Sequence, residues 1–276
     1  MGLCSLFLNS ARRNILELND TVMDAGDEPG QLLLSSKTSL PPIRIPPDYP
    51  QRVDWREKKG ADQVLNPVRN QKACQACWAL VTVVVLESVR KIRFEQEELK
   101  LLSPQMLIDC VCEDPPADKI DTKTGCYPYA VNKAFDWLIK NSVQSEADYP
   151  YVATRGKCLH VAVPKESLKI KKYVKIKGHE RTRLLKHVAR HPLAAVIEIT
   201  KEILTLNDQV YEGLAMKPQE DPPRHAVVII GYGKDEETGK NYWLIQSSWG
   251  DEWAIGGVGK VARDVKANVE MRGLFP

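Results

Sequence analysis

Cys77 carries the strongest chemical signature in this 276-residue sequence. It follows the stretch NQKACQA and precedes the apolar run WALVTVVVL, which is typical of a buried helix. A thiol at a helix N-terminus has a lowered pKa, because free N–H groups favour the thiolate, which is the nucleophilic form. The chain holds seven cysteines, so complete pairing would still leave one sulfur free. We therefore expect Cys77 to be a nucleophile with a lowered pKa.

A cysteine nucleophile needs a base, and His225 is the candidate for that role. It lies far downstream of Cys77 in the segment PRHAV, where a predicted strand begins. An imidazole can take the proton of the thiol and later give it to a leaving group. The two residues together predict nucleophilic catalysis.

Two other kinds of cysteine site use the same residues. Cys74 and Cys77 with Cys110 and Cys112 would supply four thiolates to a structural zinc, but the second pair is one residue short of the usual spacing. Cys74-x-x-Cys77 would also fit a redox dithiol, yet the βαβ context of such motifs is missing. Both interpretations are weaker than the nucleophile, and we expect no metal and no organic cofactor.

The elements that must position these residues change in type along the chain. After Cys77 the middle third reads as helical, and residues 130–140 repeat apolar side chains at helical spacing. The last third contains short β-branched or aromatic runs separated by Gly and Pro, at 193–199, 226–232, 242–246 and 258–261. A helical block followed by strands predicts an α+β architecture with the site at the seam.

Composition and charge exclude several classes of protein. With 43% hydrophobic and 27% charged residues, the chain reads as folded rather than disordered or fibrous. No apolar run approaches the ~20 residues of a membrane span, and the formal net charge of +3 does not indicate a nucleic-acid partner. A basic stretch at residues 165–190 alternates lysine with Ile or Val, which favours the solvated face of a strand over a polyanion site.

Four blocks of the sequence resemble the papain-like cysteine proteases, and the likeness runs from the RVDWR segment at residue 52 to the C-terminus. These blocks are NQKACQACWAL, LLSPQMLIDC, RHAVVIIGYG and NYWLIQSSWGDEWAIGGVGKVAR. The resemblance implies a fold with a helical left subdomain and an antiparallel, barrel-like right subdomain with a cleft between them. We expect a peptidase domain at 51–276, with helices at about 62–172 and the sheet at about 173–276 plus 51–61.

The resemblance also implies a role for individual residues. Cys77 would attack a peptide carbonyl, His225 would act as acid and base, and Gln71 would hold the oxyanion. Trp249 matches the indole that shields the histidine from water. The implied disulfides are Cys74–Cys126 and Cys110–Cys158, which leave Cys77 free, with Cys4 and Cys112 as spare thiols; the family's third bridge is absent, with Glu270 near its position.

The chain departs from the family pattern at three places in the site. Ser247 stands where the family has the asparagine that orients the histidine, and we expect its shorter side chain to need a bridging water. Tyr127 and Pro128 replace paired glycines at the cleft wall, so we expect an altered non-primed subsite there. Gln75 adds bulk beside the nucleophile. These losses predict weakened activity.

The expected function is that of a monomeric cysteine-type endopeptidase that acts on polypeptides and binds protein inhibitors of such enzymes. The alternative is a catalytically inactive homologue that binds peptides or an inhibitor. Residues 1–50 read as an extension, partly disordered, without a recognisable signal peptide or full propeptide. Family likeness suggests a lysosome, vacuole or the extracellular space, while this N-terminus indicates none of them.

Overall fold

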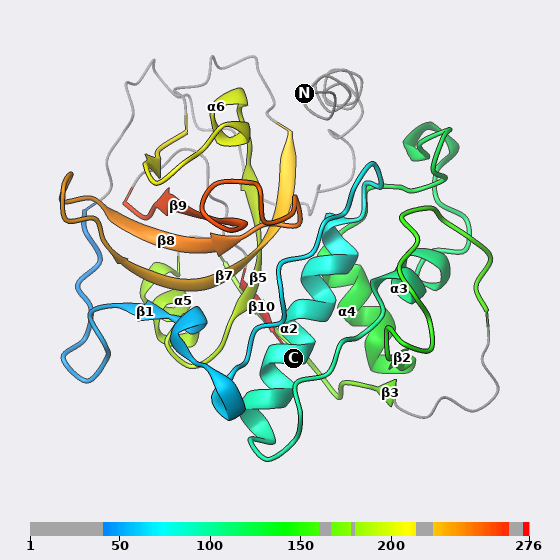
Figure 1. The fold of residues 1–276 in the computed structure, drawn as a ribbon, viewed down its shortest axis with the longest axis horizontal. Coiled ribbons are helices and arrows are strands. Elements are labelled where there is room, and N and C mark those ends of the chain that lie inside the picture. The colour runs from blue at the N-terminus through cyan, green and yellow to red at the C-terminus, as the bar shows by residue number, and fades with distance from the viewer. Residues whose placement is uncertain (1–40, 160–166, 178–179, 214–222, 265–272, 276) are drawn as a thin grey trace, which may run out of the picture.

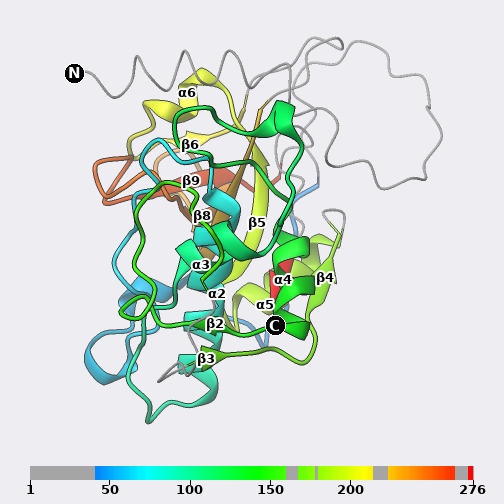
Figure 2. The ribbon, with the colours of Figure 1, turned by 90° about the vertical axis from the view of Figure 1, so that its right-hand side faces the viewer.

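Three α-helices occupy one side of the molecule, and the main sheet with two further α-helices occupies the other, as Figure 1 shows for the computed structural model. The structure describes residues 41–159, 167–177, 180–213, 223–264 and 273–275. Figure 2, which faces the helical side, shows α2, α3 and α4 in front of the sheet. This arrangement confirms the α+β architecture.

The longest described helix, α2, has 17 residues and is buried on nearly all sides. It packs against α3 and α4 on one side and against β7 on the other. A helix between two layers needs apolar side chains all round, which explains its run of valines and leucines. Among the described residues, no helix is both long and apolar enough to cross a membrane. The helices are α2 (Cys77–Arg93), α3 (Pro104–Cys110), α4 (Val131–Lys140), α5 (Arg181–Val188) and α6 (Lys201–Leu204).

The sheet is open, and its described strands follow the order β4-β10-β5-β7-β8-β9-β6, with β1 paired to β7. All described pairs in it are antiparallel except β6 with β9. The expected barrel is therefore not closed. Its strands are β1 (Val53–Asp54), β4 (Val174–Ile176), β5 (Leu193–Glu198), β6 (Val210–Tyr211), β7 (Arg224–Lys234), β8 (Asn241–Gln246), β9 (Val258–Ala262) and β10 (Gly273–Phe275); β2 (Val143–Gln144) and β3 (Ser167–Leu168) form a separate pair.

Strand β7 is the centre of the sheet and carries the candidate base. It pairs with β5, β8 and β1, and both α2 and α5 pack on it. Elements on both faces bury the strand almost continuously, so it reads as an apolar run without alternation. At Gly231 a Cβ atom would lie 2.1 Å from the Val53 carbonyl oxygen, so β1 can pair here only with a glycine.

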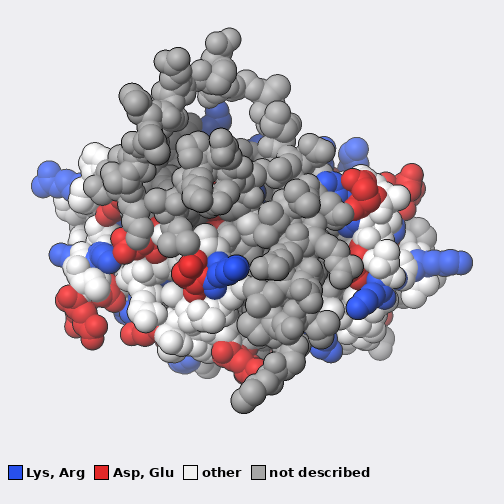
Figure 3. Space-filling model, turned by 90° about the horizontal axis from the view of Figure 1, so that it is seen from above, with Lys and Arg blue, Asp and Glu red and all other residues white. Residues whose placement is uncertain are grey.

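The basic stretch forms less strand than expected. Only β4, with Val174, Lys175 and Ile176, is extended in the predicted segment of alternating lysines; Lys175 is exposed and Ile176 is buried, as alternation requires. The rest of the described part of residues 165–190 contains β3, loops and α5. On the face in Figure 3, acidic and basic side chains are interspersed over the described residues.

The chain before β1 is partly integrated into the fold. Ile43 and Ile45 pack against the core, and the Tyr232 hydroxyl donates to the Pro50 carbonyl at 2.8 Å. Residues 41–50 are therefore not a free extension. The predictions made for residues 1–40, including Cys4, and for Glu270 lie outside the described residues.

Candidate active site

The loop before α2 holds Cys77 in place from several directions. Cys74 is bonded to Cys126, and the Cys74 N–H donates to the Gln71 carbonyl at 3.2 Å. Ala76 precedes the helix without any side-chain cap, so no side chain satisfies the N–H groups of the first turn. The Ala79 N–H donates to the Ala76 carbonyl at 2.9 Å, so the N–H groups of Cys77 and Trp78 are the ones available to a ligand or to the thiol itself.

The Cys77 thiol lies at the boundary between the helices and the sheet. The backbone N–H groups of Ala226, Trp78 and Cys77 favour the thiolate and act to lower its pKa, and Ala226 follows His225 in β7. Burial outweighs this effect and raises the pKa of the Cys77 thiol. The expected lowering was wrong because desolvation of the thiolate outweighs the effect of the N–H groups at the helix N-terminus.

His225 is the second residue of β7 and is only 4% exposed. Its ring stacks on the Trp249 indole with 4.2 Å between centroids and 18° between planes. Trp253 supports that indole edge-on at 5.2 Å. Burial lowers the pKa of His225 to about 3, so the imidazole is neutral at neutral pH and can accept a proton.

Ser247 reaches the imidazole without a bridging water. Its hydroxyl lies 3.1 Å from His225 Nε2, so the expectation of a bridging water was wrong. The backbone brings the short serine side chain close to the imidazole, because the Ser247 N–H donates to the Gly257 carbonyl at 3.1 Å and fixes the residue beside the ring. A hydroxyl can donate or accept, however, so Ser247 does not select one imidazole tautomer as an amide oxygen does.

Gln71 is 6% exposed and is held at both ends. Its Nε2 donates to the Cys74 carbonyl at 3.1 Å, and its Oε1 accepts from the Ser248 hydroxyl at 2.6 Å. The Tyr151 hydroxyl donates to its carbonyl at 2.8 Å. The side-chain amide has two N–H bonds. One donates to the Cys74 carbonyl, so the other is available to an oxyanion.

Ser248 and Tyr151 are contacts that the sequence analysis missed. Ser248 follows Ser247 in the SSW segment, and that position was the only available signal. Tyr151 gave none, because its contact is with a backbone atom distant in sequence. Burial raises the pKa of Tyr151, and a Cys77 thiolate would raise it further, which places this phenol near the nucleophile.

A short backbone pairing joins the loop before α2 to the residues that follow β8. The Gln71 N–H donates to the Ser248 carbonyl at 2.7 Å, and Asn70 forms a bridge with Trp249. At Gly250, with φ +88°, a Cβ atom would lie 2.7 Å from the Asn70 amide. The two parts of the site therefore approach more closely than a side chain at this position would allow.

The segment that replaces the paired glycines packs around Trp78. The Trp78 indole donates to the Tyr127 carbonyl at 3.0 Å, and its ring lies 5.6 Å from that of Tyr127 and 5.4 Å from that of Tyr129. Pro128 between them is half-buried, as is Gln75 on the nucleophile loop. Aromatic side chains thus surround the residue that follows Cys77.

The cysteines of the described residues are paired as the resemblance implied. The bridges are Cys74–Cys126 and Cys110–Cys158, and the free thiols are Cys77 and Cys112. This pairing removes Cys74 and Cys110 from the zinc interpretation and Cys74 from the redox dithiol. Cys77 is thereby left as an unpaired thiol.

Comparisons with known proteins agree over most of the chain. The model of the papain family cysteine proteases matches residues 49–275. Fruit bromelain of Ananas comosus is 33% identical over 233 residues, and macrodontain-1 of Ananas macrodontes is 33% identical over 234 residues. Each match covers 82% of this chain; it covers 60% of fruit bromelain and 98% of macrodontain-1. The chain also covers 59% of ananain, so it spans about three fifths of two of these relatives.

Solved structures give the same result. The bromelain protease from Ananas comosus in complex with the E64 inhibitor superposes with a TM-score of 0.67 at 29% identity, over 82% of this chain and 98% of that one. The ragweed pollen allergen Amb a 11, a cysteine protease in its proform, gives 0.68 at 32% identity, over 83% of this chain and 65% of that one.

Proposed function

Because this chain belongs to the papain family of cysteine proteases, we propose that it hydrolyses peptide bonds through Cys77 and His225. The observation that carries the proposal is the effect of the Ala226 backbone N–H, which acts to lower the pKa of the Cys77 thiol. It puts the thiol beside the backbone of the residue that follows the candidate base. We expect polypeptide substrates and a monomer.

The proposed reaction starts from a neutral thiol and a neutral imidazole. His225 contacts Ser247 through Nε2, so Nδ1 is the nitrogen that takes the Cys77 proton as sulfur attacks the substrate carbonyl. The oxyanion is held by the free N–H bond of the Gln71 amide and by the Cys77 backbone N–H. Collapse of this intermediate breaks the C–N bond, and the imidazolium gives its proton to the leaving amine.

The second half of the reaction returns the site to its starting state. Water attacks the thioester while His225 Nδ1 takes one of its protons. The C–S bond then breaks, the carboxylic acid product leaves, and Cys77 recovers its proton from the imidazolium. Ser247 orients the ring in each step, and we expect lower activity because its hydroxyl accepts or donates without preference.

The aromatic packing around Trp78 favours one alternative, a homologue that binds peptides without cleaving them. Tyr127, Pro128 and Tyr129 occupy the segment where the family has paired glycines. Tyr127 is buried, whereas Pro128 and Tyr129 are half-buried and would limit the approach of a substrate backbone. Such a protein would retain peptide or inhibitor binding and lack turnover.

The test is hydrolysis of a mixed fluorogenic peptide library by the full chain, combined with labelling by E64. We expect turnover, and mass spectrometry should locate the label on Cys77. Cys77→Ala should abolish both, whereas Cys112→Ala, which removes the other described free thiol, should change neither. Peptide binding without turnover or labelling would replace the proposal with the alternative.

A further inference from the structure

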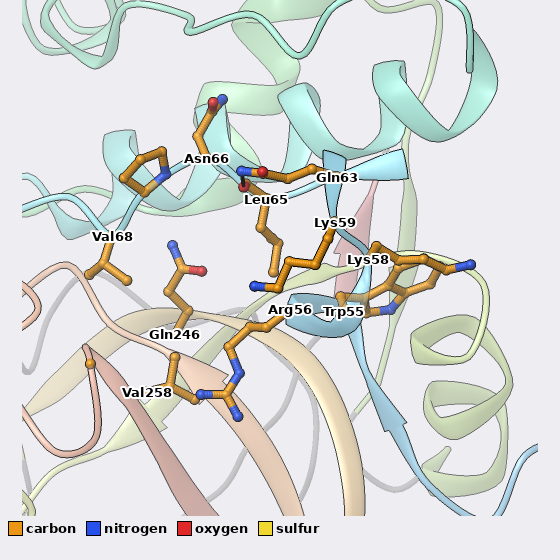
Figure 4. Close-up of a pocket in the computed structure, with 12 residues that line it drawn as sticks. Trp55, Arg56, Lys58, Lys59, Gln63, Leu65, Asn66, Val68, Gln246 and Val258 are labelled. Carbon is orange, nitrogen blue, oxygen red and sulfur yellow. Dashed lines mark hydrogen bonds between the residues drawn. The ribbon is translucent and has the colours of Figure 1, made fainter. Parts of the chain in front are cut away.

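A second cavity lies away from Cys77 and His225. Its volume is about 220 Å³, and it separates the segment at residues 55–68 from the strands β8 and β9. Figure 4 shows its lining side chains, among them Lys59, Leu65 and Gln246. The proposed reaction uses no residue of this lining.

The amide of Gln246 points into this cavity, as Figure 4 shows, although the residue is only 4% exposed. Its backbone pairs with Val228 and Val258, but its side chain makes no hydrogen bond with any described residue. The cavity is the space in which a ligand could satisfy this group.

Lys59 brings a positive charge to the same space. Its ammonium extends into the cavity in Figure 4, and it forms no ion pair with another residue of the described ranges. Lys58 also lines the cavity, but its ammonium points away from Gln246 in the same view. Arg56 also lines the cavity, but its guanidinium is held by Asp54 at 2.7 and 3.0 Å. Lys59 is therefore the cation available to a ligand in this cavity.

The remaining wall is largely apolar. Leu65, Val68 and Val258 face the cavity, and the Trp55 ring is fixed by its N–H donating to the Val188 carbonyl at 2.9 Å. The volume is below the roughly 300–1,000 Å³ of sites for drug-sized ligands. It suits a compact ligand with one anionic end and an apolar body.

We propose that this cavity binds a small organic carboxylate with an aromatic or branched aliphatic body. One carboxylate oxygen would accept from the Lys59 ammonium and the other from the Gln246 amide, while the body lies against Leu65 and Val68. An amide isostere of the same shape lacks the charge that Lys59 pairs with. Gln246 precedes Ser247 in the chain, so the site adjoins the proposed catalytic machinery without sharing a residue with it.

Binding of benzoate to the full chain, followed by NMR, tests this site without reference to peptide hydrolysis. We expect benzoate to shift the Gln246 side-chain amide resonance, and its neutral isostere benzamide to bind about tenfold or more weakly, since a charge-assisted hydrogen bond is lost. Equal binding of the two compounds would overturn the proposal. Competition by inorganic sulfate that is as strong as that by benzoate would also overturn the proposal, because the site would then recognise negative charge alone and not the apolar body of the ligand.

Two neighbouring lysines provide a matched pair of variants. Lys59→Gln should weaken benzoate binding about tenfold or more, whereas Lys58→Gln, the same change one residue away, should leave it within about twofold. Gln246→Glu keeps the side-chain shape and should abolish binding by placing a carboxylate opposite the ligand; thermal unfolding checks that each variant is folded. Equal losses in the two lysine variants would mean diffuse surface attraction and contradict the site.

Discussion

The two parts of the active site are fixed to very different degrees. On the helical side, a disulfide at Cys74 and hydrogen bonds at both ends of Gln71 fix the loop that carries Cys77. On the sheet side, the His225 ring has one hydrogen bond, to Ser247, and one stacking contact, to Trp249. The loop that carries the thiol is therefore fixed by several bonds, while the imidazole is oriented by one hydroxyl and one stacked ring.

The largest expected effect concerns the burial of His225. The ring has a pKa of about 3 in the folded protein, against an ordinary value of 6.5, so the unfolded state binds its proton first as the pH falls. The stability it contributes is complete above about pH 6.5 and is lost towards pH 3, and it amounts to on the order of 5 kcal/mol. Chemical denaturation at a series of pH values should show this loss, and His225→Gln should remove much of it.

The control for this pH dependence is a second histidine. His191 has a pKa lowered to about 4, also by burial, and it lies outside the site. His191→Gln should therefore remove a separate part of the same pH dependence. If His225→Gln left the pH dependence unchanged, the ring would be accessible to water in the folded protein.

The next effect tests the helical side of the site, where several contacts fix the loop that carries Cys77. Gln71→Ala removes the side-chain donor to the oxyanion and should lower kcat by about 10²–10³. Ser248→Ala removes only the hydrogen bond to Gln71 Oε1 and should cost much less, because the contact with the Cys74 carbonyl remains. Steady-state kinetics measures kcat for both variants. Equal losses of kcat would contradict this account and would mean that Gln71 serves only to hold the loop in place.

A smaller effect is expected on the weakly held side. Ser247→Ala removes one hydrogen bond of about 0.5–1.5 kcal/mol, which corresponds to a roughly 2 to 13-fold fall in kcat. Ser247→Asn supplies an amide oxygen that only accepts, and should raise kcat by a factor in the same range. An unchanged rate in both variants would show that the orientation of the imidazole does not limit turnover, and would shift attention to the Tyr127 and Tyr129 packing.

The smallest effect comes from strain in the nucleophile loop. Lys72 has φ +55°, in the left-handed region that costs a residue with a side chain about 1–2 kcal/mol. Glycine relieves this strain but gives back about 0.5–1 kcal/mol of backbone entropy. Lys72→Gly should therefore raise the free energy of unfolding by about 0.5–1 kcal/mol in denaturant titrations, while a decrease would mean that the exposed lysine contributes contacts of its own.

The sequence predicted the helix and strands around the candidate residues better than the chemical environment of those residues. The apolar run after Cys77 corresponds to α2, and the runs at 193–199 and 242–246 correspond to β5 and β8. Local patterns predicted these elements because the type of a helix or strand depends on residues that are adjacent in the sequence. The raised pKa of Cys77 could not be read in this way, because it results from burial of the helix end against β7.

The direct approach of Ser247 to the imidazole shows the same limit. Side-chain length alone predicted a bridging water, but the backbone hydrogen bond to Gly257 brings the residue close enough for contact. The contact of Tyr151 with Gln71 likewise depends on a chain path that no local pattern records. Features fixed by pairing between distant segments were the ones missed.

The central claim is that His225 activates Cys77, and alkylation by iodoacetamide at pH 6 tests it most directly. Cys112, a free and partly exposed thiol of the same chain, serves as the internal reference when modified peptides are quantified by mass spectrometry. Cys77 should react faster than Cys112, and His225→Gln should slow it by about 10²-fold or more while leaving Cys112 unchanged. A Cys77 rate that is the same with and without the imidazole would contradict the account.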